Sequence, residues 1–311
     1  MMSIREFRLR LIDDLPARPT LPGFSALKGG ADGLLWIREY PDPLQDEVVW
    51  VGFSEAWERR KRIEMPASLH VLPLCRTAVL IPALNEEEAL PAVLGSLPVA
   101  QLCAVVVADN GSTDGTARVA RAAGAVVVYE RTRGYGAACL AGLDYLGSLD
   151  PAPEVVVFLD ADHPEDARRL SLILSPIGRE ADLVLGVRVA RDGEPGNLHA
   201  HARWGNRLVL AAVRLLFGRR FEDLPPFRAI RLAALGRLAM DDRNWGWTLQ
   251  MQLRAVRCGL RIVEVRTPRY PRAAGRSKIS GRLGTSLRVG AKMFYTLARE
   301  RLRDMCGADR R

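Results

Sequence analysis

Three groups of polar side chains in the middle of the chain could bind a ligand together. They occupy residues 82–87 (PALNEE), 109–115 (DNGSTDG) and 160–165 (DADHPE). Each group directly follows a short apolar run, which is where a buried strand would end. In an open parallel sheet, ligands collect at the carboxyl ends of the strands. The three groups are therefore predicted to meet above one edge of a sheet.

The pair Asp160 and Asp162, separated only by Ala161, is the most specific of these patterns. Carboxylates that converge at a strand end repel each other and need a cation or hydrogen-bond donors. Mg²⁺ and Mn²⁺ prefer oxygen ligands and take remaining positions from water and substrate phosphates. We predict a Mg²⁺ or Mn²⁺ site at Asp160 and Asp162. The alternative is a solvated acidic turn, and His163 is either a third ligand or a polar loop residue.

Each polar residue taken alone also fits a simpler role. Asn85 or Ser112 could be a helix N-cap that accepts a hydrogen bond from a backbone amide. Asp114 and Glu87 could complement a helix dipole. The joint pattern favours a ligand site, because carboxylates directly follow two separate apolar runs.

The elements that would position these groups form a regular alternation from Thr77 onward. Short apolar runs cover residues 78–81, 104–107, 125–128, 155–159, 183–185 and 262–265. Helix-length segments cover residues 86–97, 116–123, a stretch ending at 146, then 203–217, 245–256 and 283–303. This alternation predicts an α/β fold with a mainly parallel central sheet flanked by helices.

The first 75 residues do not share this rhythm. Residues 34–37 and 48–51 could be strands and residues 54–62 a short helix, with prolines interrupting the rest. We predict an N-terminal appendage over residues 1–75, a catalytic domain over 76–281, and a basic C-terminal helix and tail over 282–311.

Composition limits the partners and the compartment. The net charge is +9, only four of the 45 basic residues are lysines, and the excess gathers beyond Arg266. A basic end suits an anionic partner, but no nucleic-acid-binding module is present, so nucleic acid is discounted. The five cysteines are scattered, and no signal peptide or membrane-length apolar stretch is found. We expect a cytoplasmic protein, either free or peripheral at the inner face of the membrane.

The order of residues 81–87, 109–114 and 160–162 resembles family 2 glycosyltransferases of the GT-A fold. Within them it resembles the branch that includes polyprenyl-phosphate (dolichyl-phosphate) mannose and glucose synthases. Residues 226–230 (PFRAI), 245–248 (WGWT) and 275–281 (GRSKISG) are similar to bacterial members of that branch. The resemblance extends over about residues 77–292.

The resemblance implies a nucleotide-sugar site, with a metal that bridges the aspartate pair and the diphosphate. Its glycines would let the backbone pass close to the nucleotide. The implied donor-site residues are Pro82, Ala83, Asn85, Glu86, Asp109, Gly111, Ser112, Gly134, Gly136, Asp160 and Ala161. The implied catalytic residues are Asp160, Asp162 and Arg228.

The acceptor or the diphosphate is expected to contact Arg228, Trp247, Arg276 and Lys278. The alternatives are exposed surface cations and, for Trp247, a packing role. Many relatives carry Glu where Gln250 stands, and Gln250 cannot remove a proton. A phosphate monoester, with a second pKa of ~6, is already anionic at neutral pH and needs no base. An alcohol acceptor would need a carboxylate, for which Asp223 and Asp241 are weak candidates.

The predicted function is transfer, with inversion, of a sugar from a UDP- or GDP-sugar to a polyprenyl phosphate. The closing helix would either lie on a membrane or fold onto the domain. One alternative is a nucleotide-sugar-binding protein without turnover. Another is a dinucleotide-binding oxidoreductase built on Gly134 and Gly136, although Cys139 stands where its fingerprint needs a third glycine.

Overall fold

The computed structural model describes two strands near the N-terminus, at residues 24–29 and 33–38, and then residues 74–162, 167–179, 181–189, 200–268 and 283–305. The chain divides into two compact units, Met1–Ala67 and Ser68–Arg311. Each unit is described by itself.

The first unit contains an antiparallel pair, β1 (Phe24–Gly29) and β2 (Gly33–Arg38), in which Phe24 pairs with Arg38 and Gly29 with Gly33. Strand β2 confirms the strand predicted at residues 34–37, whereas β1 was not predicted. The expected strand at 48–51 and helix at 54–62 lie outside the described residues.

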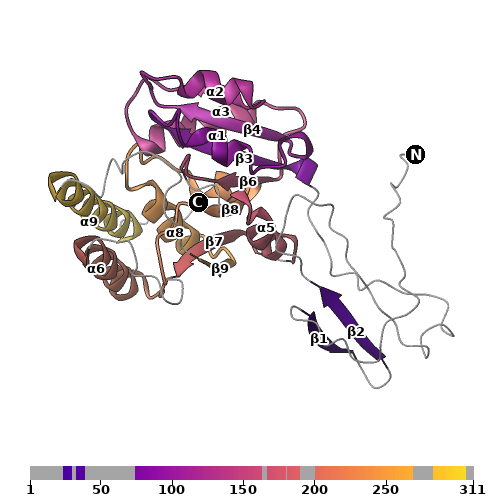
Figure 1. The fold of residues 1–311 in the computed structure, drawn as a ribbon. Coiled ribbons are helices and arrows are strands. Elements are labelled where there is room, and N and C mark those ends of the chain that lie inside the picture. Colours follow the sequence, from indigo (N-terminus) through magenta and orange to yellow (C-terminus); the bar gives the residue numbers. More distant parts are fainter. Residues whose placement is uncertain are drawn as a thin grey trace. The chain divides into compact units, whose positions relative to one another are not determined.

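The second unit is built on a seven-stranded sheet in the order β5-β4-β3-β6-β8-β7-β9. One half is parallel and consists of β5 (Val126–Tyr129), β4 (Ala104–Asp109), β3 (Thr77–Ala83) and β6 (Val155–Phe158). The central strands of this half are runs of β-branched and other apolar residues, buried on both faces because helices cover the sheet. The predicted mainly parallel α/β fold is confirmed (Figure 1).

The other half of the sheet was predicted less completely. Strand β8 (Arg228–Arg231) runs antiparallel between β6 and β7 (Leu183–Val189), and β9 (Ile262–Pro268) pairs with β7 in parallel. The strand β8 was missed because only two apolar residues separate its terminal arginines. In this register, Arg228 of β8 pairs with Phe158 of β6 on one side and with Leu185 of β7 on the other.

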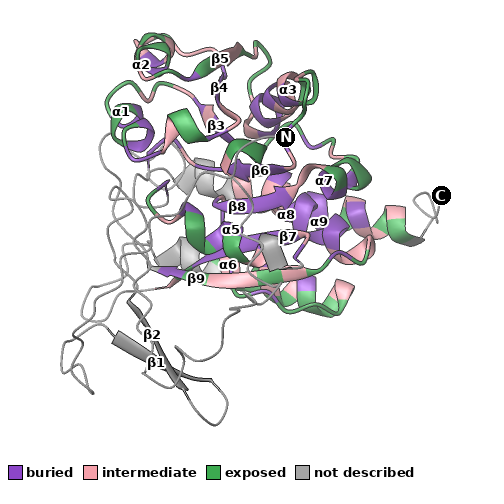
Figure 2. Cartoon of the chain, turned by 90° about the vertical axis from the view of Figure 1, so that its right-hand side faces the viewer, coloured by how far each residue is buried: buried purple, intermediate pink, exposed green. Residues whose placement is uncertain are grey.

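Helices pack on both faces of this sheet around two separate apolar cores. One core contains residues of α1 (Leu90–Leu94), α2 (Thr116–Ala122) and α5 (Leu170–Arg179). The other core contains residues of the remaining helices. These are α3 (Tyr135–Gly147), α6 (Ala200–Phe217), α7 (Leu232–Leu238), α8 (Trp247–Arg257) and α9 (Leu283–Met305). Figure 2 shows the buried strands between helices that are exposed on their outer sides.

The final helix, α9, folds onto the domain through one face, where Leu297 and Glu300 are buried. It packs against α6 and α8, and Figure 1 shows α6 and α9 side by side. Its other face exposes Phe294, Tyr295 and Leu302. Among the described residues, no helix is both long enough and apolar enough to cross a bilayer.

Candidate active site

The strand register brings the three polar groups to one edge of the sheet. Ala83 pairs with Asp109 across β3 and β4, and Leu80 pairs with Phe158 across β3 and β6. The Leu159 amide donates to the Leu80 carbonyl, so this alignment continues toward the Asp160 turn. Since neighbouring strands lie about 4.8 Å apart, Asp109 and the Asp160 turn flank the end of β3 at a spacing of roughly 10 Å.

The loops after β3 and β4 are joined by reciprocal hydrogen bonds. The Asn85 amide donates to Ser112 Oγ at 2.9 Å, and Asn85 Oδ1 accepts from the Thr113 amide at 2.8 Å. Asp109 Oδ1 accepts from the Ser112 amide at 2.8 Å. Neither Asn85 nor Ser112 is therefore a helix N-cap. Their side chains fix one loop against the other and so shape the edge above β3 and β4.

The simpler role does hold for Asp114 and Glu87, because both serve the start of α2. Asp114 Oδ1 accepts from the Thr116 amide at 3.0 Å, and Glu87 Oε2 accepts from the Gly115 amide at 2.6 Å. The Glu86 amide donates a hydrogen bond to Thr116 Oγ1 at 2.9 Å. Residues 86–89 are thus held in turns, and α1 begins at Leu90 rather than at the predicted residue 86.

Asn110 positions the glycine turn that precedes α3, a role that the sequence did not reveal. Its Nδ2 donates to the carbonyls of Glu130 and Thr132 at 3.2 and 2.7 Å, and its Oδ1 accepts from the Gly134 amide at 2.7 Å. The side chain is buried. The only available signal was its place directly after Asp109, at the end of a buried strand.

Gly134 and Gly136 lie against another segment of the main chain, a contact that the sequence did not reveal. A Cβ atom on Gly134 would collide with the Arg243 carbonyl, and one on Gly136 would collide with the Asp242 carbonyl. Gly134 also has a φ of +152°, which side chains disfavour. These glycines admit the main chain of residues 242–243, and Arg243 accepts a hydrogen bond from the Ala137 amide at 2.9 Å. This contact alone requires glycine at both positions.

The acidic pair lies beside the first turn of α3. Burial and the negative charge of Asp160 raise the pKa of Tyr135, and Asp162 acts in the same direction. The same two causes, burial and then Asp160, raise the pKa of the Cys139 thiol one turn later. Asp162 is only 6% exposed. Asp160 is partly buried, and two neighbouring carboxylates of which one is buried would be stabilised by a cation.

The donor set fits a divalent ion that is completed by a ligand. Asp160 and Asp162 offer hard oxygen donors, which suits Mg²⁺ or Mn²⁺. In the described ranges, no three His, Cys, Asp or Glu side chains form a group that could hold a metal ion alone. The other ligands would have to come from water and a diphosphate, which commonly complete the coordination of such ions. His163 lies outside the described residues.

Arg228 and Trp247, which were predicted to contact the acceptor or the diphosphate, are almost completely buried. Arg228 is 1% exposed, and its guanidinium donates to the carbonyls of Thr248, at 3.0 Å, and Pro225. Burial lowers the pKa of Arg228 to about 10, so it stays charged at neutral pH. Trp247 is also 1% exposed and packs on Phe158 with ring centroids 6.2 Å apart. Arg276 and Lys278 lie outside the described residues.

The two carboxylates considered as bases are committed to arginines. Asp223 forms a two-bond ion pair with Arg188, at 2.7 and 3.0 Å. Burial opposes ionisation of Asp223, but the ion pair with Arg188 and the backbone hydrogen bonds together outweigh burial and lower the pKa of Asp223. Asp241 is paired with Arg254, Arg299 and Arg303, and its pKa is lowered despite partial burial. Both remain ionised yet neutralised, which makes them poor proton acceptors.

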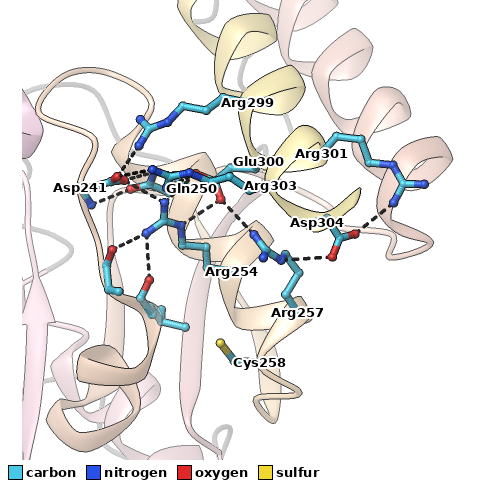
Figure 3. Close-up of polar contacts among 12 residues, drawn as sticks. Asp241, Gln250, Arg254, Arg257, Cys258, Arg299, Glu300, Arg301, Arg303 and Asp304 are labelled. Carbon is cyan, nitrogen blue, oxygen red and sulfur yellow. Dashed lines mark hydrogen bonds and ion pairs between the residues drawn. The ribbon is translucent and has the colours of Figure 1, made fainter. Parts of the chain in front are cut away.

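Gln250 is a structural residue rather than a substitute for a base. Its Oε1 accepts from the amides of Asp241 and Asp242 at 3.1 and 2.9 Å. Its Nε2 donates at 2.8 Å to Asp241 Oδ1 and to Glu300 Oε1 (Figure 3). All four hydrogen-bonding positions of the amide are thus filled. A carboxylate in this place would face two others.

Comparison with known proteins agrees with this geometry. The profile of glycosyl transferase family 2 matches residues 78–238. An uncharacterised glycosyltransferase of Mycobacterium tuberculosis is 39% identical over 213 residues, which are 67% of this chain and 92% of that protein. The polyprenol monophosphomannose synthase of Mycolicibacterium smegmatis is 34% identical over 237 residues, which are 70% of this chain and 85% of that protein.

A solved structure has the same fold. Glucosyl-3-phosphoglycerate synthase from Mycobacterium tuberculosis, in complex with phosphoglyceric acid, is 25% identical with a TM-score of 0.56, covering 72% of this chain and 79% of that one. A second structure of that synthase, 24% identical at a TM-score of 0.56 and with the same coverage, contains Mn²⁺, UDP and glucosyl-3-phosphoglycerate.

The chain belongs to glycosyl transferase family 2. It is a glycosyltransferase with a GT-A-type fold, which removes the oxidoreductase alternative.

Replacing Gln250 by Glu is expected to destabilise the protein without raising its activity. In the variant, the two hydrogen bonds that Gln250 Nε2 donates to Asp241 and Glu300 are lost, and a third carboxyl group stands beside these two carboxylates. We expect the free energy of unfolding to fall by about 2–4 kcal/mol. Urea denaturation measures this cost. The matched control is Gln101→Glu, at an exposed position, which should leave stability unchanged. Faster sugar transfer by Gln250→Glu would contradict the structural role.

Proposed function

We propose that this enzyme transfers a sugar from a UDP- or GDP-sugar to a polyprenyl phosphate, with inversion and with Mg²⁺ or Mn²⁺, at the inner face of the cytoplasmic membrane. The observation that carries this proposal is the position of Asp109 and of the Asp160–Asp162 turn on either side of the end of β3. A single ligand bound over the end of β3 could contact acidic and amide groups on both sides.

The nucleotide would bind over the end of β3, where Pro82, Ala83 and Glu86 lie. Asp109 and the loop with Gly111 and Ser112 would border it on one side, and Asp160 with Ala161 on the other. These residues lie at the ends of buried strands or in the loops that directly follow them, so the main chain beneath the ligand is rigid. Such fixed groups bind a ligand with little reorganisation. The reciprocal bonds between the Asn85 and Ser112 loops add to this rigidity.

Asp162, with Asp160, would hold the divalent ion on the diphosphate side. A bound Mg²⁺ or Mn²⁺ offsets the negative charge that builds up on a departing diphosphate. Two carboxylates leave coordination positions for phosphate oxygens and water. The related synthase of the same fold was crystallised with Mn²⁺, so Mn²⁺ is the first ion to test.

A phosphate acceptor fits a site whose candidate bases are occupied. Asp223 and Asp241 are held in ion pairs, and Gln250 carries no charge. A phosphate monoester is already nucleophilic at neutral pH and needs positioning more than deprotonation. The M. smegmatis relative is named for making polyprenol monophosphomannose, which favours a lipid phosphate acceptor. The structure with phosphoglyceric acid makes a small phosphorylated acid the second candidate.

Access to a lipid acceptor would be helped by the outer face of α9. Phe294, Tyr295 and Leu302 are 48%, 59% and 60% exposed there, and Leu215 on the adjacent α6 is 84% exposed. Arg288, earlier on the same helix, is exposed as well. Apolar side chains flanked by cations suit the interface of a membrane that contains anionic lipids. This face would hold the enzyme where its acceptor is.

Replacing Asp162 by Asn should lower metal-dependent sugar transfer by about 100-fold or more, because the ion would lose a charged ligand. The thermal transition should not fall, since the substitution also relieves repulsion from Asp160. Release of nucleoside diphosphate from a panel of UDP- and GDP-sugars measures the activity. The exposed Asp144 on α3 provides the control variant Asp144→Asn. Unchanged turnover in Asp162→Asn would rule out this metal site.

With a polyprenyl phosphate acceptor, the rate should rise as the pH rises through about 6 and then level off, since the acceptor loses its second proton there. Product formation from polyprenyl phosphate, polyprenol and 3-phosphoglycerate can be compared under identical conditions. Transfer to polyprenol would contradict a phosphate nucleophile. Transfer to 3-phosphoglycerate alone would replace the lipid acceptor by a small acid.

Negative charge introduced on the outer face of α9 should release the enzyme from membranes. The double variant Phe294→Glu, Leu302→Glu is expected to sediment poorly with vesicles that contain phosphatidylglycerol, whereas the natural sequence should sediment with them. The control is Leu172→Glu, at an exposed position on α5, which should behave like the natural sequence. Equal sedimentation of the double variant would contradict the membrane contact.

A further inference from the structure

The inner face of α9 is tied to the segment of residues 239–246, here called the bridging loop. Lys292 Nζ lies 2.7 Å from Asp242 Oδ2, a distance typical of an ion pair although the angles are not those of a hydrogen bond. Arg299 and Arg303 both donate to Asp241 Oδ2. Figure 3 shows these arginines reaching Asp241 from α9. The helix thus contacts both acidic residues of the loop.

A second connection runs through α8. Glu300 on α9 is fully buried and accepts two hydrogen bonds from Arg254, from Nε and Nη2, each at 2.9 Å. Glu300 also accepts a hydrogen bond from Gln250 Nε2. Oε1 of the same Gln250 side chain accepts hydrogen bonds from the amides of Asp241 and Asp242. The bridging loop is therefore held between α8 and α9 through both side chains and main chain.

The opposite side of the bridging loop lies on the glycine turn that starts α3. The carbonyls of Asp242 and Arg243 lie against Gly136 and Gly134 so closely that neither glycine could carry a side chain. The Ala137 amide donates to the Arg243 carbonyl at 2.9 Å. Contact between two main chains leaves no flexible side chain to absorb a movement. A shift of the bridging loop must therefore shift the start of α3.

The start of α3 is also close to the acidic pair, Asp160 and Asp162. Tyr135, between the two glycines, lies within the electrostatic reach of both Asp160 and Asp162. Oδ1 of Asn110, the residue after Asp109, accepts a hydrogen bond from the Gly134 amide. The contacts form a continuous path from Lys292 and Glu300, through the bridging loop and the glycine turn, to both sides of the candidate site.

Asp242 is the most sensitive point of this path. Its side chain is 0% exposed, and the ammonium group that compensates it comes from α9, where the Lys292 side chain is 24% exposed. Within the loop, the Asn244 amide donates to the other carboxylate oxygen at 2.8 Å. A buried carboxylate that loses its counter-ion must move toward water or be protonated. Either change would disturb the loop that lies on the glycine turn.

We propose that α9 is a positioning element for donor binding, in which Lys292 and Glu300 hold the bridging loop against the Gly134–Gly136 turn. This inference rests on the proposed nucleotide-sugar site. Lys292 and Glu300 touch no substrate in this arrangement. They act by keeping the start of α3 in register with the Asp109 and Asp160 loops.

The test compares Lys292→Met, Lys292→Arg and the control Arg301→Met, whose ion-pair partner Asp304 also lies on α9. Calorimetry measures the binding of UDP and GDP with Mn²⁺, and kinetics give KM and kcat for the donor. Lys292→Met should weaken nucleoside diphosphate binding and raise the donor KM by about three- to tenfold. Lys292→Arg should recover most of the affinity, and Arg301→Met should bind as the natural sequence does. If Lys292→Met does not fold, Lys292→Gln takes its place.

Two results would overturn the positioning role. One is a lower melting temperature for Lys292→Met with unchanged nucleotide binding, which would leave α9 a purely stabilising element. The other is an equal loss of affinity in Arg301→Met, which would trace the effect to net charge. Failure of the natural sequence to bind UDP or GDP would instead overturn the nucleotide-sugar assignment on which the inference rests.

Discussion

Mutual repulsion of carboxylates at the ends of two parallel strands on either side of β3 is the constraint on which this structure depends. Asp109 ends β4, Asp160 and Asp162 follow β6, and β3 lies between them with Ala83 at its end. Parallel strands direct their carboxyl ends to the same edge, so the charges cannot separate. The loops around them supply amide donors to Asp109 and leave the Asp160 pair facing the start of α3. A site built in this way is suited to a metal-bound diphosphate.

The predictions from sequence were most successful where burial alone determines structure. Residues 78–81 and 104–107 are apolar on both faces, which only a covered parallel strand explains, and both were predicted as strands. The strand β8 was missed because its two arginines look like surface residues. Arg228 is in fact buried against main-chain carbonyls, a placement that no local pattern reveals. The position of the acidic strings at strand ends, by contrast, followed from sequence order.

Contacts between residues far apart in the chain account for other features that the sequence did not reveal. Gly134 and Gly136 resemble a nucleotide-binding turn, but the chain that fills their space comes from residues 242–243, more than one hundred positions later. Gln250 looks like a lost base, yet its amide joins Asp241, Asp242 and Glu300. Tertiary pairing of this kind leaves no periodic signal in sequence. It is consistent with an acceptor that needs no base, because the polar groups of this region are used in holding α8, α9 and the bridging loop together.

The most direct test of the central claim is the location of Mn²⁺ by anomalous X-ray scattering from crystals grown with UDP or GDP. This account predicts one Mn²⁺ ion that contacts Asp162, with or without Asp160, and the diphosphate, with the nucleoside over the end of β3 beside Asp109. A Mn²⁺ ion or a nucleotide bound away from this edge of the sheet would contradict it.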